Sequence, residues 1–328
     1  MTSLLTFPIL AYVLAMAGGF AVTAVSLPVW RAWCRRIGLV DDPGHRKIHT
    51  EPVPLAGGLA VLTGIMVPLT TGFVALKAGL FDAGAVQALT HGFERRQVQL
   101  FALLAGAVGM VVLGWVDDQH ELPAKHKFAG QVLIAGVVAA AGVRITLFVP
   151  SVVFSLLVTV LWIVTLTNAL NFMDNMNGLC AGLGVIASFC FGMKAALGGQ
   201  YLVALLAFLC AGALAGFLPY NFPRATVFLG DAGSHLVGYL LGVLAILPHF
   251  YTKEHPSVLA VLNPLLILAV PLLDLLWVVV LRWRAGRPVY LGDTNHLSHR
   301  LVRQGLRPTL AVLLIWLLSA VTGVLAFR

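Results

Sequence analysis

Long apolar segments, separated by short polar connections, run through the whole sequence. A helix that crosses the hydrocarbon core of a bilayer needs about 20 mostly apolar residues, and hydropathy gives about ten runs of this kind. They cover 4–30, 56–76, 98–116, 127–141, 152–171, 179–197, 201–218, 232–247, 258–281 and 309–327. The segments at 127–141 and 232–247 are the least clearly defined.

The composition excludes an ordinary water-soluble domain. Hydrophobic residues make up 59% of the 328-residue chain and charged residues only 10%, whereas a soluble domain carries about 25% charged residues. Such a chain lacks the polar side chains that an aqueous surface needs. We therefore predict an all-α integral membrane protein, a polytopic bundle of about ten transmembrane helices that forms a single domain over residues 1–328.

Lysine and arginine are distributed unevenly between alternate connections. Of the 21 residues of these two types, 14 lie in the connections 31–55, 117–127, 219–231 and 282–308. The positive-inside rule makes these connections cytoplasmic, which predicts a multi-pass protein of the inner (plasma) membrane. The net charge of +8 follows from this topology, so no nucleic-acid partner is expected.

The acidic residues gather on the same predicted side. Of the 13 Asp and Glu residues, 10 lie in the cytoplasmic connections or at the adjacent helix ends. A transport pathway would place its polar groups near the middle of the bilayer. The one-sided polarity therefore predicts a site at the cytoplasmic face beside the inner leaflet, and it argues against the alternative class, a lipid or solute transporter.

Two adjacent carboxylates, Asp117 and Asp118, end the third segment. They repel each other unless a cation or a hydrogen-bond donor relieves the repulsion, and carboxylates with few competing ligands suit Mg²⁺ beside substrate phosphates. Lys127 follows in the same connection and is suited to a phosphate. A solvated loop whose lysines only set the topology is the alternative.

The end of the fifth segment carries a stripe of amides. Asn168, Asn171 and Asn175 recur at steps of three and four residues, so they share one helical face. Asp174 lies beside them. Such a stripe is costly inside a membrane unless it faces partners or water. It predicts a site, although hydrogen bonds between helices would account for one or two of the amides.

Asp231 lies between two glycines, Gly230 and Gly233, at the start of an apolar segment. The glycines allow a close backbone approach, and the start of the helix offers free N–H groups to an anion. An ordinary N-cap formed by Asp231 and Ser234 is the alternative. Asp274, inside a later apolar segment, is interpreted as a brace for a neighbouring helix.

Two connections carry clusters of basic residues and histidines. In the last cytoplasmic connection, one helical turn would present His296, His299 and Arg300 together to a phosphate or an anionic headgroup. Two histidines at this spacing could instead bind a metal, and a loop that only sets the topology is a third interpretation. The first connection carries a similar cluster, Arg46, Lys47 and His49.

Taken together, these motifs resemble a known family, the polyprenyl-phosphate N-acetylhexosamine-1-phosphate transferases. This family includes the WecA/TagO branch, MraY and the eukaryotic dolichyl-phosphate GlcNAc-1-phosphate transferase. The resemblance covers the chain from Asp41 to Gly305. It depends on five motifs in the family's order, which are DDPGHRKIHTEPVPLAGG, DDQHELPAKHK, NALNFMDNMNG, FLGDAGS and DTNHLSHRL.

The resemblance implies a reaction and a cofactor. A UDP-N-acetylhexosamine and a polyprenyl phosphate (undecaprenyl phosphate in many bacteria) would give polyprenyl-diphosphate-HexNAc and UMP, with Mg²⁺ or in its place Mn²⁺. GlcNAc-1-phosphate is the expected group, and another UDP-HexNAc donor is the alternative. A homodimer is compatible with the resemblance.

The resemblance also implies roles for single residues, by motif position. Asp117 and Asp118 would be catalytic and handle the lipid phosphate nucleophile. Asp231 with Asn171 would hold the metal and the diphosphate. The implied substrate-binding residues are Lys127, Asp174, Asn177, Arg46, Lys47, His49, His296, His299 and Arg300.

Two departures from the family pattern bear on the substrate. The bacterial D-G-x-D-G run is D-N-M-N-G over residues 174–178, so its second acid is an amide, as in the eukaryotic branch. The H-x-H-H run of the WecA/TagO branch is H-L-S-H over residues 296–299. The triple histidine of MraY is absent, which argues against a MurNAc-pentapeptide substrate. These replacements leave an inactive family scaffold as a further alternative.

Overall fold

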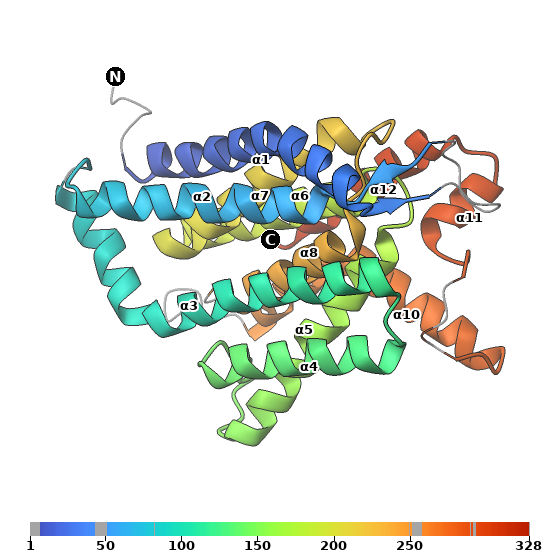
Figure 1. Cartoon of the computed structure of the whole chain (residues 1–328). Helices are drawn as coiled ribbons and strands as arrows, with labels where there is room; N and C mark the ends of the chain where they lie inside the picture. The colour runs from blue at the N-terminus through green and yellow to red at the C-terminus, as the bar shows by residue number, and fades with distance from the viewer. Residues whose placement is uncertain are drawn as a thin grey trace.

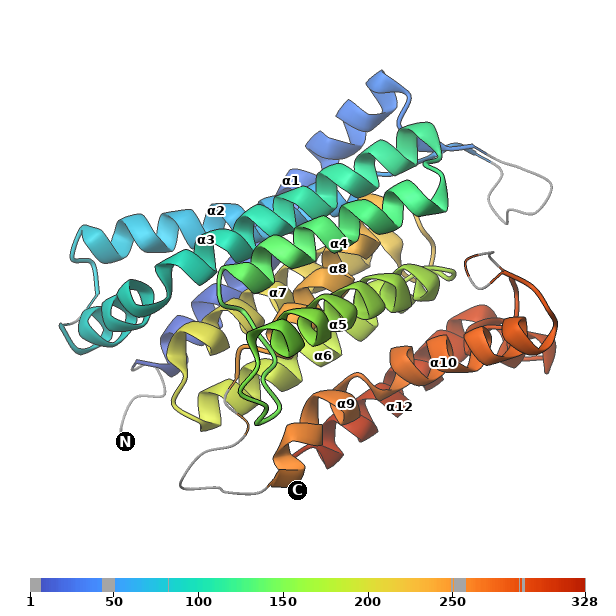
Figure 2. The same cartoon turned by 90° about the horizontal axis from the view of Figure 1, so that it is seen from below.

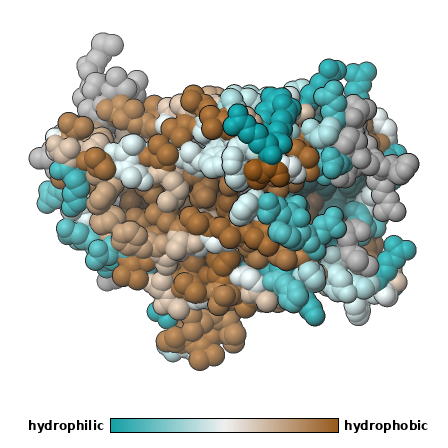
Figure 3. Space-filling model, in the orientation of Figure 1, coloured by the Kyte–Doolittle hydropathy of each residue, from teal (hydrophilic) through white to brown (hydrophobic). Residues whose placement is uncertain are grey.

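The structure is a computed structural model that describes residues 7–42, 51–81, 83–248, 250, 258–288, 290 and 293–327. Long helices lie side by side in one bundle, with a short two-stranded ribbon at one end (Figure 1). Hydrophobic residues cover the long flank of the bundle, and hydrophilic residues gather over the end that carries the ribbon (Figure 3). This distribution is the one expected of a helical bundle embedded in lipid.

The helices follow the predicted apolar segments along the chain. The first eight are α1 (Ile9–Ile37), α2 (Gly57–Lys77), α3 (Ala83–His120), α4 (Ala124–Ala140), α5 (Val152–Met173), α6 (Leu179–Leu197), α7 (Tyr201–Asn221) and α8 (Gly230–Leu244). The remaining helices are the 3₁₀ helix η1 (Val258–Leu262), α9 (Asn263–Ile267), α10 (Ala269–Arg284), α11 (Leu297–Arg303) and α12 (Pro308–Leu325). The all-α polytopic membrane class is therefore confirmed.

The predicted count of ten spanning helices is not confirmed within the described part of the chain. Seven helices are long and apolar enough to cross a bilayer, and the count rises to eight if a bent pair of helices forms one span. The two short helices, α4 with 17 residues and α8 with 15, fall outside this count. They correspond to the two least clearly defined segments of the sequence.

The bent pair replaces the single helix predicted over 258–281. α9 and α10 meet at Leu268 and are bent by 71°. Pro271 lies in the first turn of α10, where its missing N–H is tolerated. In a continuous helix the same proline would remove a backbone hydrogen bond. The break therefore falls three residues before the proline that a continuous helix would accommodate poorly.

The remaining differences from the predicted segments are local. α3 begins well before residue 98 and contains a kink at Arg96, where the backbone angles are not helical. β1 (Val40–Asp41) and β2 (Val53–Pro54) form an antiparallel pair with Val40 opposite Pro54. This ribbon fixes the two ends of the connection between α1 and α2.

The connections predicted to be cytoplasmic lie at one end of the bundle. The α1–α2, α3–α4, α5–α6, α7–α8 and α10–α11 connections are all found there, and the start of α1 and the end of α12 lie toward the opposite end (Figures 1 and 2). The motif residues of the described chain are thus brought to one end, which we call the motif end.

Helix α8 is the central element of this end. It packs against α2, α3, α5 and α6, and all its residues from Ala232 to Leu244 are buried. Glycines make this packing possible, because a Cβ atom at Gly58 would lie 2.5 Å from the Gly233 nitrogen. A Cβ atom at Gly114 of α3 would lie 2.4 Å from the Asp231 backbone. The start of α8 is therefore held directly against the backbones of α2 and α3.

Candidate active site

The centre of the motif end is a lysine between two carboxylates. Lys127 Nζ, at the start of α4, lies 2.6 Å from Asp117 Oδ2 at the end of α3. The same nitrogen donates a hydrogen bond of 2.9 Å to Asp231 Oδ2 at the start of α8. Three separate helices thus contribute one charge each. The cation relieves the repulsion between the two acids, as charges at this distance require.

Asp118 has a different partner from its neighbour. Its Oδ1 accepts a hydrogen bond of 2.8 Å from the Asp231 backbone N–H, and its Oδ2 accepts one of 3.1 Å from Ala232 N–H. These are free N–H groups of the first turn of α8, which need acceptors. Gly230, with φ of 72°, allows the close approach, because a Cβ atom there would lie 2.8 Å from Asp118 Oδ2. Asp118 therefore holds the backbone that carries Asp231.

The predicted stripe of amides divides into three different contacts. Asn171 Nδ2 donates to Asp231 Oδ1 at 2.5 Å and to Ser234 Oγ at 2.9 Å, so it belongs to the central cluster. Asn168 lies one turn further from the motif end and donates to other groups. Asn175 accepts a hydrogen bond of 2.6 Å from Ser298 Oγ of α11. Asn168 and Asn171 lie on one face of α5, whereas Asn175 lies in the turn after the helix ends at Met173, and only Asn171 touches the carboxylates.

The connection between α5 and α6 lies beside this cluster. Burial, and after it the negative charges of Asp231 and Asp118, raise the pKa of Asp174 to about 8. Asn177 Nδ2 donates a hydrogen bond of 3.3 Å to the Pro223 carbonyl, which ties this connection to the one between α7 and α8.

The start of α11 is anchored to α10. His296 Nδ1 lies 2.6 Å from Asp274 Oδ2, and the Leu297 N–H donates to Asp274 Oδ1 at 2.7 Å. Both side chains of this pair are buried. The brace predicted for Asp274 is thus found, and α11 is the element that it supports. The His296 ring also lies 5.7 Å from the Phe172 ring, next to Asn171.

The other two members of the histidine cluster lie further along α11. Partial burial, then the nearby His296 and Arg303 side chains, lower the pKa of His299. The Arg300 guanidinium lies 4.9 Å from the centre of the Trp277 ring in a cation–π contact. Arg46, Lys47 and His49 of the first connection lie outside the described residues.

The cluster offers few side chains that could bind a metal ion. No group of three or more His, Cys, Asp or Glu side chains in the described chain could enclose one. Mg²⁺ does not need such a cage, because it usually binds one or two carboxylates together with phosphate oxygens and water. Asp231, with its side chain 33% exposed, offers a carboxylate ligand of this kind. Asn171 directs its Nδ2 at Asp231, so its Oδ1 is the amide atom that could serve as a second oxygen ligand. The residues present fit Mg²⁺ shared with a diphosphate.

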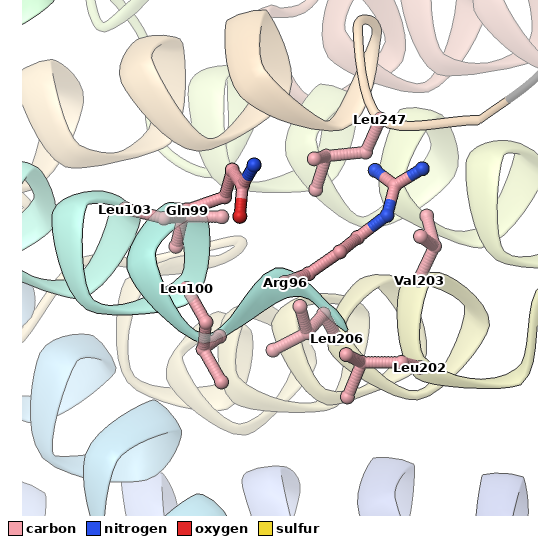
Figure 4. Close-up of a pocket in the computed structure, with 8 residues that line it drawn as sticks. All are labelled: Arg96, Gln99, Leu100, Leu103, Leu202, Val203, Leu206 and Leu247. Atoms are coloured by element: carbon pink, nitrogen blue, oxygen red, sulfur yellow. The ribbon is translucent and has the colours of Figure 1, made fainter. Parts of the chain in front are cut away.

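A cavity at the other end of the bundle takes no part in this cluster. It has a volume of only about 20 Å³ and is lined mainly by leucines, with Arg96 and Gln99 as its polar members (Figure 4). Arg96 lies roughly 30 Å from Asp117 by the helical rise along α3. Because its lining is so apolar and so distant, the cavity is excluded as part of the same site.

Several residues of the motif end were not predicted. Arg282 Nε donates to Asp293 Oδ2 at 2.9 Å, and this bond, working against burial, lowers the pKa of Asp293. Gln131 and His235 are fully buried and form a polar contact below the cluster. A signal existed for these two, since each lies four residues after a motif residue, Lys127 or Asp231, within an apolar run.

Comparisons with known proteins give one consistent result. Residues 100–249 match the family model described as glycosyl transferase family 4. A probable undecaprenyl-phosphate N-acetylglucosaminyl 1-phosphate transferase of Bacillus subtilis (strain 168) is 30% identical over 96% of this chain and 84% of its own length. A decaprenyl-phosphate N-acetylglucosaminephosphotransferase of Mycobacterium tuberculosis (strain H37Rv) is 36% identical over 90% of this chain and 76% of its own length.

A third relative is more distant but matches over nearly the same span. The undecaprenyl-phosphate alpha-N-acetylglucosaminyl 1-phosphate transferase of Escherichia coli (strain K12) is 28% identical over 94% of this chain and 82% of its own length. The matches therefore cover the helices on both sides of the central cluster as well as the cluster itself.

Proposed function

This chain belongs to glycosyl transferase family 4, the polyprenyl-phosphate N-acetylhexosamine-1-phosphate transferases, and on that premise we propose that it transfers GlcNAc-1-phosphate from UDP-GlcNAc to a polyprenyl phosphate and releases UMP. The observation that carries this proposal is the cluster of Asp117, Lys127, Asp231 and Asn171, gathered from four helices at one end of the bundle. Family membership and the names of the relatives support the reaction.

The proposed cofactor is Mg²⁺, bound by Asp231 with the Asn171 amide and completed by the substrate diphosphate. When bound, the ion supplies charge neutralisation that makes UMP a better leaving group. The partial exposure of Asp231 and the oxygen donors around it support this assignment. Lys127 remains on the other carboxylate oxygen of Asp231 and adds a second positive charge beside the phosphates.

In the proposed reaction, an oxygen of the polyprenyl phosphate attacks the β-phosphorus of the UDP-sugar. A new P–O bond forms there, the bond from the β-phosphorus to the bridging oxygen breaks, and UMP leaves with that electron pair. In phosphoryl transfer, the protein contributes mainly by positioning the reactants and neutralising their charge. A phosphate monoester is largely dianionic at pH 7, with a second pKa of about 6. Asp117 therefore needs to accept at most a residual proton.

We place the cluster at the cytoplasmic face of the inner membrane. Of the 17 lysine and arginine residues in the described chain, 12 lie in the connections of the motif end, in α11 or in the adjacent helix ends, which supports this orientation through the positive-inside rule. The UDP-sugar would then enter from the cytoplasm, and the lipid phosphate from the inner leaflet. The location of the polar residues at one end of the bundle, away from its middle, argues against a transport pathway.

The proposal is tested with membranes or purified protein, radiolabelled UDP-GlcNAc and undecaprenyl phosphate, with and without EDTA. Label is expected to enter the lipid fraction, to stop entering it in EDTA, and to resume when Mg²⁺ is restored. A panel of UDP-amino-sugars in the same assay identifies the donor. Transfer that is unchanged in EDTA contradicts the metal assignment. Label that crosses the bilayer unmodified would show a transporter.

A Lys127→Met variant tests the central cation. The substitution keeps the length of the side chain but leaves Asp117 and Asp231 facing each other without a positive charge, so kcat is expected to fall about tenfold or more. Initial rates of UMP release from purified protein measure the effect. Lys125→Met is the matched control, because Lys125 is exposed on the same helix, and it should keep wild-type rates. Equal rates in the two variants would show that Lys127 takes no part in the reaction.

A further inference from the structure

A second set of polar side chains lies one helical turn below the central cluster, within the bundle. It consists of Asn168 of α5, Gln131 of α4 and His235 of α8. Each lies three or four residues from a member of the cluster on the same helix, since Asn168 precedes Asn171, Gln131 follows Lys127 and His235 follows Asp231. Residues at these spacings share one helical face. The two sets are therefore stacked on the same three helices.

These three side chains are joined in a chain of hydrogen bonds. Asn168 Nδ2 donates a bond of 2.7 Å to Gln131 Oε1. Gln131 Nε2 lies 3.2 Å from His235 Nε2. Gln131 and His235 are 0% exposed. The bonds thus connect α5 to α4 and α4 to α8 in a region from which water is excluded.

The direction of every bond in this chain follows from one backbone carbonyl. Asn168 Nδ2 also lies 2.8 Å from the Val164 carbonyl oxygen, and only a donor is favourable there. Gln131 must then accept from Asn168 with its oxygen and donate to His235 with its nitrogen. His235 Nε2 is consequently the acceptor, and its proton is on Nδ1. All of these hydrogen bonds form between neutral side chains.

This series of buried hydrogen bonds lowers the stability of the folded protein more than a purely structural contact should. His235 Nδ1 is buried and has no hydrogen-bond partner among the described residues. An unpaired buried donor destabilises the folded protein, so apolar side chains at the same positions would pack without that cost. Buried polar contacts that are kept despite their cost can fix the register of packed helices.

We propose that Asn168, Gln131 and His235 are positioning residues that fix the rotation and height of α5, α4 and α8, so that Asn171, Lys127 and Asp231 converge. This inference depends on the proposed function, because its effect is measured on that reaction. A misplacement of about 1 Å can lower a reaction rate about 100-fold. If one of these hydrogen bonds is broken, one of the three helices can shift relative to the others. The reaction rate changes with that shift.

The test compares four variants of the full-length protein in detergent or nanodiscs. Gln131→Met and His235→Leu break the chain with side chains of similar size. His235→Gln keeps an acceptor for Gln131 and is the conservative rescue. Ser188→Ala is the matched control, because Ser188 is 0% exposed and its hydroxyl has no partner among the described residues. For each variant, kcat and KM for UDP-GlcNAc are measured per amount of folded protein, together with the thermal unfolding temperature.

The two breaking variants are expected to lower kcat about 10- to 100-fold, with KM within about twofold of the wild-type value. His235→Gln should recover most of kcat, and Ser188→Ala should match the wild type. Wild-type kcat in Gln131→Met and His235→Leu overturns the inference. So does an equal loss in Ser188→Ala, which would indicate a general sensitivity of the bundle to core substitutions.

An inactive wild-type protein would refute the proposed function but not this inference. The unfolding temperatures of Gln131→Met, His235→Leu and the double variant then decide it. Coupled residues are expected to give a double-variant shift clearly smaller than the sum of the single shifts. Additive shifts would show that the two side chains do not act together, and would overturn the inference independently of any activity.

Discussion

Replacing Asp231 by asparagine is expected to abolish transfer, with kcat lowered about 1,000-fold or more, while the protein stays folded. Asp231 is the one carboxylate of the central cluster that contacts both Lys127 and Asn171. The amide keeps the shape of the side chain but removes the negative charge needed to bind Mg²⁺. The fold should tolerate the change, because Lys127 retains Asp117 as its partner.

The effect is measured as label entering undecaprenyl-linked lipid per amount of monodisperse protein on size-exclusion chromatography. Glu94→Gln is the matched control, since it makes the same chemical change at an exposed position far along α3 from the cluster. Glu94→Gln should keep wild-type turnover. Near-wild-type turnover in Asp231→Asn would refute the proposed metal ligand.

Replacing Gly114 by alanine is expected to reduce transfer about 100-fold and to lower stability by about 1–3 kcal/mol. The added Cβ atom would lie 2.4 Å from the backbone of Asp231 and Ala232. A backbone cannot turn aside as a flexible side chain can, so the start of α8 must move by roughly 1 Å to reach ordinary van der Waals contact. Asp231 and the bonds from Asp118 move with it.

The control for this variant is Gly136→Ala in α4, where an added Cβ atom has nothing within 4 Å. Alanine favours a helix over glycine, so Gly136→Ala should keep full activity and unfold at the same or a slightly higher temperature. Both variants are compared by thermal unfolding and by kcat. If Gly114→Ala were as active as Gly136→Ala, the close packing of α3 on α8 would not control the position of Asp231.

Much of the architecture could be predicted from hydropathy alone. Each of the ten apolar segments contains a helix or, for 258–281, a bent pair of helices. The grouping of the described motif residues at one end was also predicted, because alternate connections of a spanning bundle return to the same side. The shared face of Asn168 and Asn171 follows from helical periodicity, but periodicity did not show that α5 ends at Met173, before Asn175.

The three-dimensional contacts could not be predicted in the same way. A hydropathy profile does not report the angle between consecutive helices, so it could not predict the bend between α9 and α10. Asp117 and Asp118 are adjacent in the sequence, yet one contacts Lys127 and the other the first turn of α8. That difference depends on where α8 packs, which is a property of residues more than a hundred positions later. His296 likewise finds Asp274 only once α11 folds back onto α10.

The burial of α8 from Ala232 to Leu244 has a consequence for the response of this protein to its lipid. Helices at the periphery, such as α1 and α12, adjust to a thicker or thinner membrane by tilting. α8 is enclosed by α2, α3, α5 and α6, so hydrophobic mismatch reaches it only through these neighbours. The aspartate at its start is thereby insulated from changes in acyl-chain length, and one set of contacts serves bilayers of different thickness.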